Sequence, residues 1–145
     1  MNISLIGYGE VGRILAEDLA PQGHSVAAYD TKLEGEGGNA LREHAAKLGI
    51  TLADSHASAV QRAELVLSAV TASQTVAVAE ACGPAIRPGT WFLDFNSASP
   101  GAKVKAAATR STLLSRKADS REITESSSPS AASASQRQAS STRAL

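Results

Sequence analysis

Apolar runs alternate with amphipathic segments along the first hundred residues of the chain. The apolar runs expected to form strands are residues 3–6, 25–29, 50–52, 65–70 and 91–95. Between them, apolar residues at helical spacing and cap signals predict helices over residues 10–21, 39–48, 55–62, 73–81 and 99 to about 108. Strands that alternate with helices of this length build βαβ units, so the pattern predicts an α/β fold.

The strand segments are continuous apolar runs rather than alternating ones. Such runs are typical of parallel strands whose two faces are both covered by helices. Because crossover connections between parallel strands are right-handed, the expected architecture is a Rossmann-like doubly wound sheet of about five parallel strands. Ligands bind at the carboxyl ends of the strands in such sheets, which is where candidate residues are sought.

A glycine pattern follows directly after the first strand and opens the first helix. Residues 7–12 match G-x-G-x-x-G, in the strand–turn–helix context that a dinucleotide-binding loop needs. The first glycine allows a sharp turn, the second lets the backbone approach a pyrophosphate, and the third lets the helix pack close to the strand. The helix N-terminus then offers free N–H groups to the phosphates. A purely structural turn is the alternative. The predicted cofactor-binding residues here are Gly7, Tyr8, Gly9, Glu10, Val11 and Gly12.

An acidic residue, Asp30, ends the second strand eighteen residues after Gly12. A carboxylate at this place accepts hydrogen bonds from the adenosine ribose and repels a 2′-phosphate, which favours NAD over NADP. Lys32 lies two residues further on and could compensate for that repulsion. The alternative is that Asp30 only caps the following loop.

Polar residues follow the fourth and fifth strands at the same expected edge of the sheet. Val70 and Thr71 are predicted to contact the cofactor, although Thr71 or Ser73 could equally serve as a helix cap. Asn96 and Ser97 offer an amide and a hydroxyl beside the expected nicotinamide pocket, so they are predicted to bind substrate. Two neighbours are assigned structural roles, Asp94 as a fold residue and Ser99 as a helix cap.

Composition narrows the partners and the setting. The 145-residue chain has a formal net charge of zero, so its electrostatics favour neither a nucleic acid nor a membrane surface. No apolar run reaches the roughly 20 residues that a membrane helix needs. The single cysteine, Cys82, excludes a disulfide framework and fits a reducing, cytoplasmic setting. The histidine and cysteine spacing contains neither a metal-ligand cluster nor a nucleophile–base pair, so we expect no metal.

The composition changes sharply near residue 108. Residues 1–108 are rich in Ala, Val, Leu, Ile and Gly, and are predicted to form an NAD(P)-binding domain. Residues 109–145 are rich in Ser, Ala and Arg, contain no aromatic residue, and cannot bury enough apolar surface to fold. They are predicted to be a disordered C-terminal tail. Binding of nucleic acid by this basic tail is disfavoured because it lacks aromatic side chains for stacking.

Taken together, the motifs resemble the N-terminal NAD(P)-binding domain of the 6-phosphogluconate dehydrogenase-like, or β-hydroxyacid dehydrogenase, family. The resemblance covers about residues 1–108 and is carried by residues 6–12, 23–26, 67–70 and 93–101. The last of these segments is similar to the family's Asp-x-Ser-Thr-x-x-Pro element, with Asn96 and Ser97 in place of Ser-Thr.

The resemblance implies a function for the longer proteins of this kind. Full-length members transfer a hydride between NAD(P) and a small hydroxy acid, and assemble as homo-oligomers through an all-helical C-terminal domain. The family's Ser-Gly-Gly substrate element and its catalytic lysine do not occur here, and Lys103, Lys105 and Lys117 lie in the wrong context. We therefore expect a cofactor half that is inactive alone and meets a hydroxy acid only if the missing domain is supplied.

Two further expectations follow from that mismatch. The break in composition inside a predicted helix indicates a frameshift or a truncated gene near codon 108, which the other reading frames of the gene would test. The alternative to a dehydrogenase half is a stand-alone nucleotide-binding module or sensor, which a separate partner chain carrying the missing domain would favour.

Overall fold

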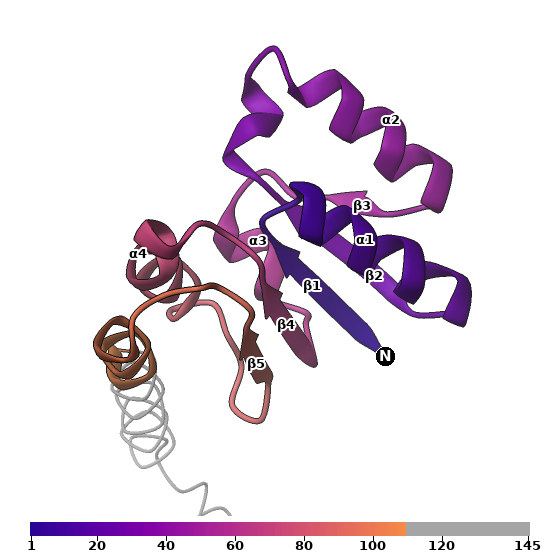
Figure 1. Ribbon diagram of the computed structural model, residues 1–145. Coiled ribbons are helices and arrows are strands. Elements are labelled where there is room, and N and C mark those ends of the chain that lie inside the picture. The colour runs from indigo at the N-terminus through magenta and orange to yellow at the C-terminus, as the bar shows by residue number, and fades with distance from the viewer. Residues whose placement is uncertain (110–145) are drawn as a thin grey trace, which may run out of the picture.

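The computed structural model describes residues 1–109 and has the predicted α/β architecture (Figure 1). Its strands are β1 (Asn2–Ile6), β2 (Ser25–Tyr29), β3 (Thr51–Leu52), β4 (Leu65–Ser68) and β5 (Trp91–Asp94). Its helices are α1 (Glu10–Leu19), α2 (Gly38–Leu48), α3 (His56–Val60), α4 (Thr75–Cys82) and a further helix over residues 100–109. Short 3-10 turns lie at Ala20–Gln22, Thr31–Glu34 and Ala72–Gln74. The predicted tail lies, from residue 110 onward, outside the described residues.

The strands form one parallel sheet in the order β3-β2-β1-β4-β5. The chain builds outward from β1 in one direction as far as β3, then crosses back to place β4 on the other side of β1. The strand order therefore reverses between β1 and β4, and the crevice beyond the carboxyl ends of these two strands is where doubly wound folds bind ligands. The predicted fold class is confirmed.

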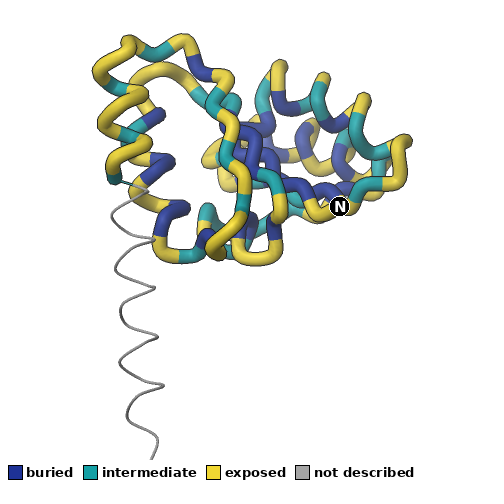
Figure 2. The backbone as a smooth tube through the Cα atoms, turned by 90° about the horizontal axis from the view of Figure 1, so that it is seen from below, coloured by how far each residue is buried: buried dark blue, intermediate teal, exposed yellow. Residues whose placement is uncertain are grey.

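Two cores lie on opposite faces of the sheet. One core places Ile3, Leu5 and Leu67 against α1 and α2. The other places Ile6 and Val66 against α3 and α4. Alternate residues of β1 thus enter different cores, as the period of a strand requires. Figure 2 shows the buried positions concentrated in the strands and on the inner sides of the helices.

Several helix ends differ from the sequence-based expectation. Ser73 does not cap α4, because residues 72–74 form a 3-10 turn and the helix begins only at Thr75, with no side-chain cap. Asn39 does not cap α2 either, because that helix already begins at Gly38. Ser99, by contrast, accepts a hydrogen bond from the Ala102 N–H (3.3 Å) and caps the helix over residues 100–109, as predicted.

Candidate dinucleotide-binding site

The three motif glycines meet three different steric demands. Gly7 has φ +92°, and a Cβ there would collide with the carbonyl oxygen of Ala69. A Cβ on Gly12 would collide with the carbonyl oxygen of Gly7, so the helix packs directly on the turn. Around Gly9, a Cβ would meet no atom within 4 Å. The turn and the close helix packing explain two of the glycines, and the open space at the third leaves room for an approaching ligand.

The N-terminus of α1 faces this open space without a protein side chain as its cap. Gly9 is the N-cap residue, and the first intrahelical bond runs from the Arg13 N–H to its carbonyl (3.0 Å). The first N–H groups of a helix lack intrahelical partners and carry the positive end of the helix dipole. An uncapped end beside an open glycine is therefore suited to a phosphate group.

The glycine turn forms one wall of a cleft of about 500 Å³ at the carboxyl ends of the strands. This volume lies within the range of small-molecule and cofactor sites. Gln74 and Val78, from the segment after β4, complete the opposite wall. Further lining residues are Ile6, Gly7, Gly9, Glu10, Val11, Tyr29, Asp30, Thr31, Lys32, His56, Ala69, Val70 and Thr71.

Asp30 both lines this cleft and caps a loop, so the two roles considered for it are compatible. Its Oδ1 accepts a hydrogen bond from the Lys32 N–H (2.9 Å), and its Oδ2 accepts one from the Tyr8 N–H (2.8 Å). The carboxylate thereby ties the glycine turn to the end of β2. An ionised carboxylate has about four acceptor positions, so it retains capacity for ribose hydroxyls.

Tyr8 belongs to the glycine motif but points into the protein rather than into the cleft. Its side chain is fully buried, and burial raises the pKa of its phenol. The Tyr8 hydroxyl bonds to Nδ1 of His44 (2.9 Å), and His44 Nε2 bonds to Glu17 Oε1 (2.9 Å). These two hydrogen bonds join the glycine turn to α2 through His44 and to α1 through Glu17. Sequence reasoning missed them because the three residues share no local spacing.

His56 is a second cleft residue that sequence reasoning missed. It begins α3, lines the cleft, and packs edge-on against Tyr29 with ring centroids 4.6 Å apart. Burial lowers the pKa of His56, which favours the neutral imidazole. An aromatic side chain ending β2 beside a histidine gives this part of the cleft an apolar wall.

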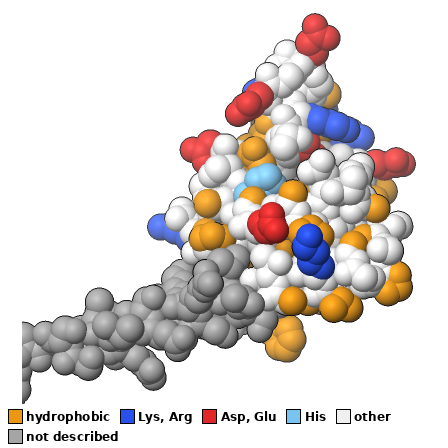
Figure 3. Space-filling model, turned by 90° about the vertical axis from the view of Figure 1, so that its left-hand side faces the viewer, with side chains coloured by type: hydrophobic (Ala, Val, Ile, Leu, Met, Phe, Trp, Pro, Cys, Tyr) orange, Lys and Arg blue, Asp and Glu red, His pale blue; other side chains and the backbone are white. Residues whose placement is uncertain are grey.

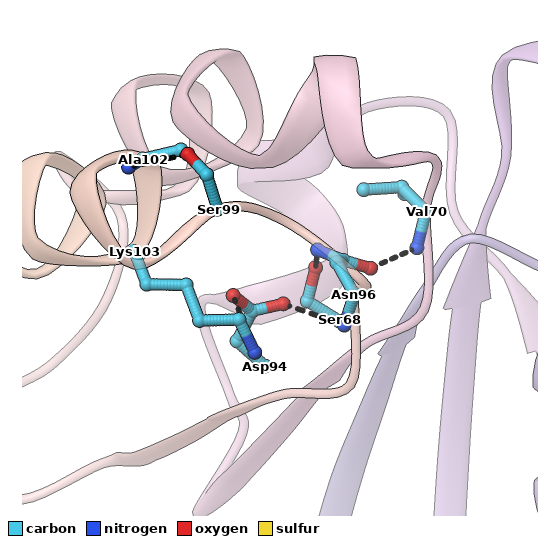
Figure 4. A network of polar contacts seen from close by, with 7 residues as sticks. All are labelled: Ser68, Val70, Asp94, Asn96, Ser99, Ala102 and Lys103. Atoms are coloured by element: carbon cyan, nitrogen blue, oxygen red, sulfur yellow. Dashed lines mark hydrogen bonds and ion pairs between the residues drawn. The ribbon is translucent and has the colours of Figure 1, made fainter.

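The residues after β4 and β5 behave differently from one another. Val70 and Thr71 line the cleft, and Thr71 makes only a weak side-chain contact, with Ser73 (3.2 Å). Asn96 is 4% exposed and Ser97 is exposed, and neither lies among the cleft-lining residues. Figure 4 shows the Asn96 amide turned inward, between Val70 and Ser68. The predicted substrate contacts of these two residues remain a prediction.

In the part of the chain that the structure describes, neither a cluster of metal ligands nor a gathering of like charges marks a second binding site. Residues 1–109 contain no group of three or more His, Cys, Asp or Glu side chains that could hold a metal ion. On the face seen in Figure 3, acidic and basic side chains are scattered rather than gathered by sign. None of the helices described within residues 1–109 is long and apolar enough to cross a membrane.

A reversed strand order, an uncapped helix behind a glycine turn, and an acidic residue directly after β2 define a dinucleotide-binding domain of the doubly wound α/β class. The model of the NAD binding domain of 6-phosphogluconate dehydrogenase matches residues 2–136, and the chain belongs to this family. That match runs past residue 108, where the resemblance in the sequence was expected to end. The family resemblance predicted from the motifs is confirmed.

Solved structures place the chain among longer proteins. A conserved hypothetical protein from Sinorhizobium meliloti 1021 is 34% identical, with a TM-score of 0.72, over 77% of this chain and 38% of its own. A conserved protein of unknown function, described as structurally similar to 3-hydroxyacid dehydrogenases, is 27% identical, with a TM-score of 0.62, over 76% of this chain and 40% of its own.

A third structure shares the fold. The 3-hydroxyisobutyrate dehydrogenase of Mycobacterium tuberculosis is 23% identical, with a TM-score of 0.68, over 77% of this chain and 37% of its own. No curated protein matches the sequence. The chain therefore spans about two fifths of the length of the solved proteins that it resembles.

Proposed function

We propose that this chain binds NAD, in preference to NADP, in the cleft beside the glycine turn. The observation that carries the proposal is the open space at Gly9, directly in front of the uncapped N-terminus of α1. A pyrophosphate in that space would accept hydrogen bonds from backbone N–H groups, as anions do at other helix N-termini. When bound, the nicotinamide ring would supply hydride-transfer chemistry, while the residues of this chain would bind and orient the cofactor.

The preference for NAD rests on Asp30. Its carboxylate lies on the cleft wall with free acceptor capacity toward ribose hydroxyls, and it would repel the 2′-phosphate of NADP. Lys32 also lines the cleft, but its backbone N–H is already bonded to the same carboxylate. This bond involves the backbone of Lys32 and not its ammonium group, so the preference for NAD requires that the Asp30 carboxylate outweigh that ammonium group.

We further propose that the chain is the cofactor half of an oxidoreductase that acts on a small hydroxy acid. The family and the likeness to a structure described as similar to 3-hydroxyacid dehydrogenases support this substrate class. Proton transfer in such a reaction needs a positioned acid or base, and the titratable side chains that line the cleft are those of Glu10, Tyr29, Asp30, Lys32 and His56, none of which is assigned that role. Catalytic groups, homo-oligomer contacts and substrate specificity would come from the helical domain that longer members of the family carry.

A cytoplasmic setting fits the same proposal. Cys82 is free and fully buried, and burial raises the pKa of its thiol to about 12. Such a thiol stays protonated and is inert as a nucleophile. A lone buried cysteine without a disulfide partner suits a reducing compartment.

The test is a fluorescence titration of the full 145-residue chain with NADH and, separately, with NADPH. We expect saturable NADH binding that Gly9→Val weakens at least tenfold, because the new side chain would fill the space of the pyrophosphate. Gly37→Val is the control for adding a side chain at an N-cap glycine: a Cβ meets no atom within 4 Å at either residue, while the backbones share φ (−75° and −77°) but differ in ψ (−9° at Gly37, −148° at Gly9). Gly37 lies outside the cleft, so this variant should bind like the unmodified chain.

Two results would overturn parts of this proposal separately. If the folded chain binds neither NADH nor NADPH, or if Gly9→Val binds as tightly as Gly37→Val, the glycine turn is not a cofactor site. If NADPH binds as tightly as NADH, the role of Asp30 in cofactor choice is wrong, while the site itself stands.

A further inference from the structure

We propose that Asn96 is a positioning residue of the cofactor cleft, which holds the segment after β4 in place, rather than a residue that contacts substrate. The inference rests on the proposed cofactor function of the cleft and assigns a role to a residue outside its walls. It follows from three features: the direction of the Asn96 amide, the place of its partner Val70, and the packing of Val70 against the glycine turn.

The Asn96 side chain is engaged at both ends inside the protein. Its Oδ1 accepts a hydrogen bond from the backbone N–H of Val70 (2.7 Å), and its Nδ2 donates one to Ser68 Oγ (3.2 Å) (Figure 4). The backbone N–H of Asn96 donates to Asp94 Oδ1 (2.9 Å). Because the Val70 N–H can only donate, the amide oxygen must face it, which fixes the orientation of the side chain.

Val70 lies just beyond the part of β4 that the sheet itself secures. The last ladder bonds at this end run from the Ala69 N–H to Ile6 (2.8 Å) and from the Phe95 N–H to Ser68 (2.9 Å). The next backbone N–H along the chain, that of Val70, bonds to the Asn96 side chain instead. The amide thus extends the link between β4 and β5 to Val70, two residues past the end of β4.

The position of Val70 matters because this residue lines the cleft and also packs against the glycine turn. Val70 lines the cleft, and its Cγ1 would lie 2.9 Å from a Cβ placed on Gly7. The turn therefore packs so closely against Val70 that a side chain on Gly7 would collide with it. A shift of Val70 would move one cleft wall relative to the pyrophosphate-binding turn, and a displacement of this kind weakens a preorganised site.

Thr90 provides a matched control at the other end of the same strand. Its Oγ1 donates to the carbonyl of Ala63 (2.9 Å), so it also ties the chain before β4 to the chain before β5 by a side-chain-to-backbone bond. Neither Thr90 nor Ala63 lines the cleft. Asn96→Ala and Thr90→Ala therefore each remove a side-chain link between the β4 and β5 segments, but only the Asn96 link holds a residue of the cleft wall, Val70.

The experiment measures NADH affinity of the full chain and its variants, at a temperature where far-ultraviolet circular dichroism shows each to be folded. Asn96→Ala loses both side-chain hydrogen bonds and should weaken NADH binding about three- to tenfold, while Thr90→Ala should change it less than about twofold. Amide hydrogen exchange at Val70 should accelerate in Asn96→Ala alone. Ser68→Ala, which removes only the partner of Nδ2, should weaken binding by about two- to threefold.

The Ser68 variant separates positioning from direct contact. If the Asn96 amide touches a ligand, loss of Ser68 frees that amide and leaves NADH affinity unchanged, which overturns the proposal. Equal weakening by Asn96→Ala and Thr90→Ala also overturns it, because the effect would then be general loosening. If Asn96→Ala does not fold, Ser68→Ala against Thr90→Ala decides alone. An unmodified chain that binds no NADH defeats the cofactor function itself, and the inference with it.

Discussion

The two flanks of the sheet differ in how well they are covered. Leu5, Leu67 and Leu93 lie side by side in register on β1, β4 and β5, on the same face. Their exposures are 1%, 5% and 46%. Two residues earlier in each strand, Ile3 of β1 is in register with Leu65 of β4, which is in register with Trp91 of β5. Ile3 is 2% exposed, whereas Trp91 is 72% exposed. Large apolar side chains on this face are therefore buried or half-buried in β1 and β4, the covered flank, and exposed in β5, the uncovered flank.

The strand order explains this gradient. Right-handed crossovers place the helices between β1 and β3 on one face, and those that follow β4 on the opposite face. The core under α1 and α2 accordingly ends at β4, while α4 packs in the core of the other face. No helix within residues 1–109 covers the face of β5 that carries Trp91 and Leu93. The cleft lies on the covered flank, so its walls rest on complete packing.

The largest expected effect comes from a substitution in the glycine turn of the covered flank. Gly7→Ala should lower the free energy of unfolding by about 4 kcal/mol, because it combines a positive φ with a collision against the Ala69 backbone. Gly23→Ala is the control, since Gly23 has φ +80° but a Cβ there would meet no atom within 4 Å. It should cost only about 1 kcal/mol. Urea unfolding measures both, and equal losses would show that the collision is relieved by movement of the turn.

Substitutions of the three leucines in register test the difference in burial between the two flanks. Leu5→Ala should destabilise by about 3 kcal/mol and Leu67→Ala by a similar amount, because both leave cavities in a packed core. Leu93→Ala should cost less than about 1 kcal/mol, because almost half of that side chain is already exposed. Denaturant unfolding of the three variants at low protein concentration is the measurement.

A loss at Leu93 as large as that at Leu5 would contradict the comparison. It would mean that the face of β5 is covered in solution. Repeating the unfolding at several protein concentrations would then distinguish a second copy of the chain, which gives a concentration-dependent midpoint, from cover within the same chain, which does not.

The sequence predicted one wall of the site better than the other. The spacing of the motif identifies Gly7 and Gly12, which meet steric demands that only glycine meets, and Gly9, which leaves space for a ligand; Asp30 is identified by its distance from the motif. Asn96 was identified as a residue of interest, but the inward direction of its amide depends on Val70, 26 residues away. The His44 and His56 contacts depend on how α2 and α3 pack. Pairings across the fold leave no local spacing in the sequence.

The smallest expected effect concerns His56, on the cleft edge of the covered flank. Burial lowers the pKa of this imidazole from 6.5, so the unfolded chain binds its proton more readily than the folded one. Its contribution to stability is therefore present above pH 6.5 and is lost as the pH falls through that value toward the folded pKa. The loss should be less than about 1 kcal/mol, because the ring is only partly buried and water screens its charge.

Subtracting the pH profile of His56→Gln from that of the unmodified chain isolates the contribution of His56 to the stability. Urea unfolding between about pH 5 and pH 8 should give a difference that grows with acidity below about pH 6.5 and is flat above it. A flat difference across the whole range would mean that His56 is solvated as fully in the folded chain as in the unfolded one. The imidazole would then lie outside the apolar cleft wall that it forms with Tyr29, and the covered flank would be looser at that edge than its packing indicates.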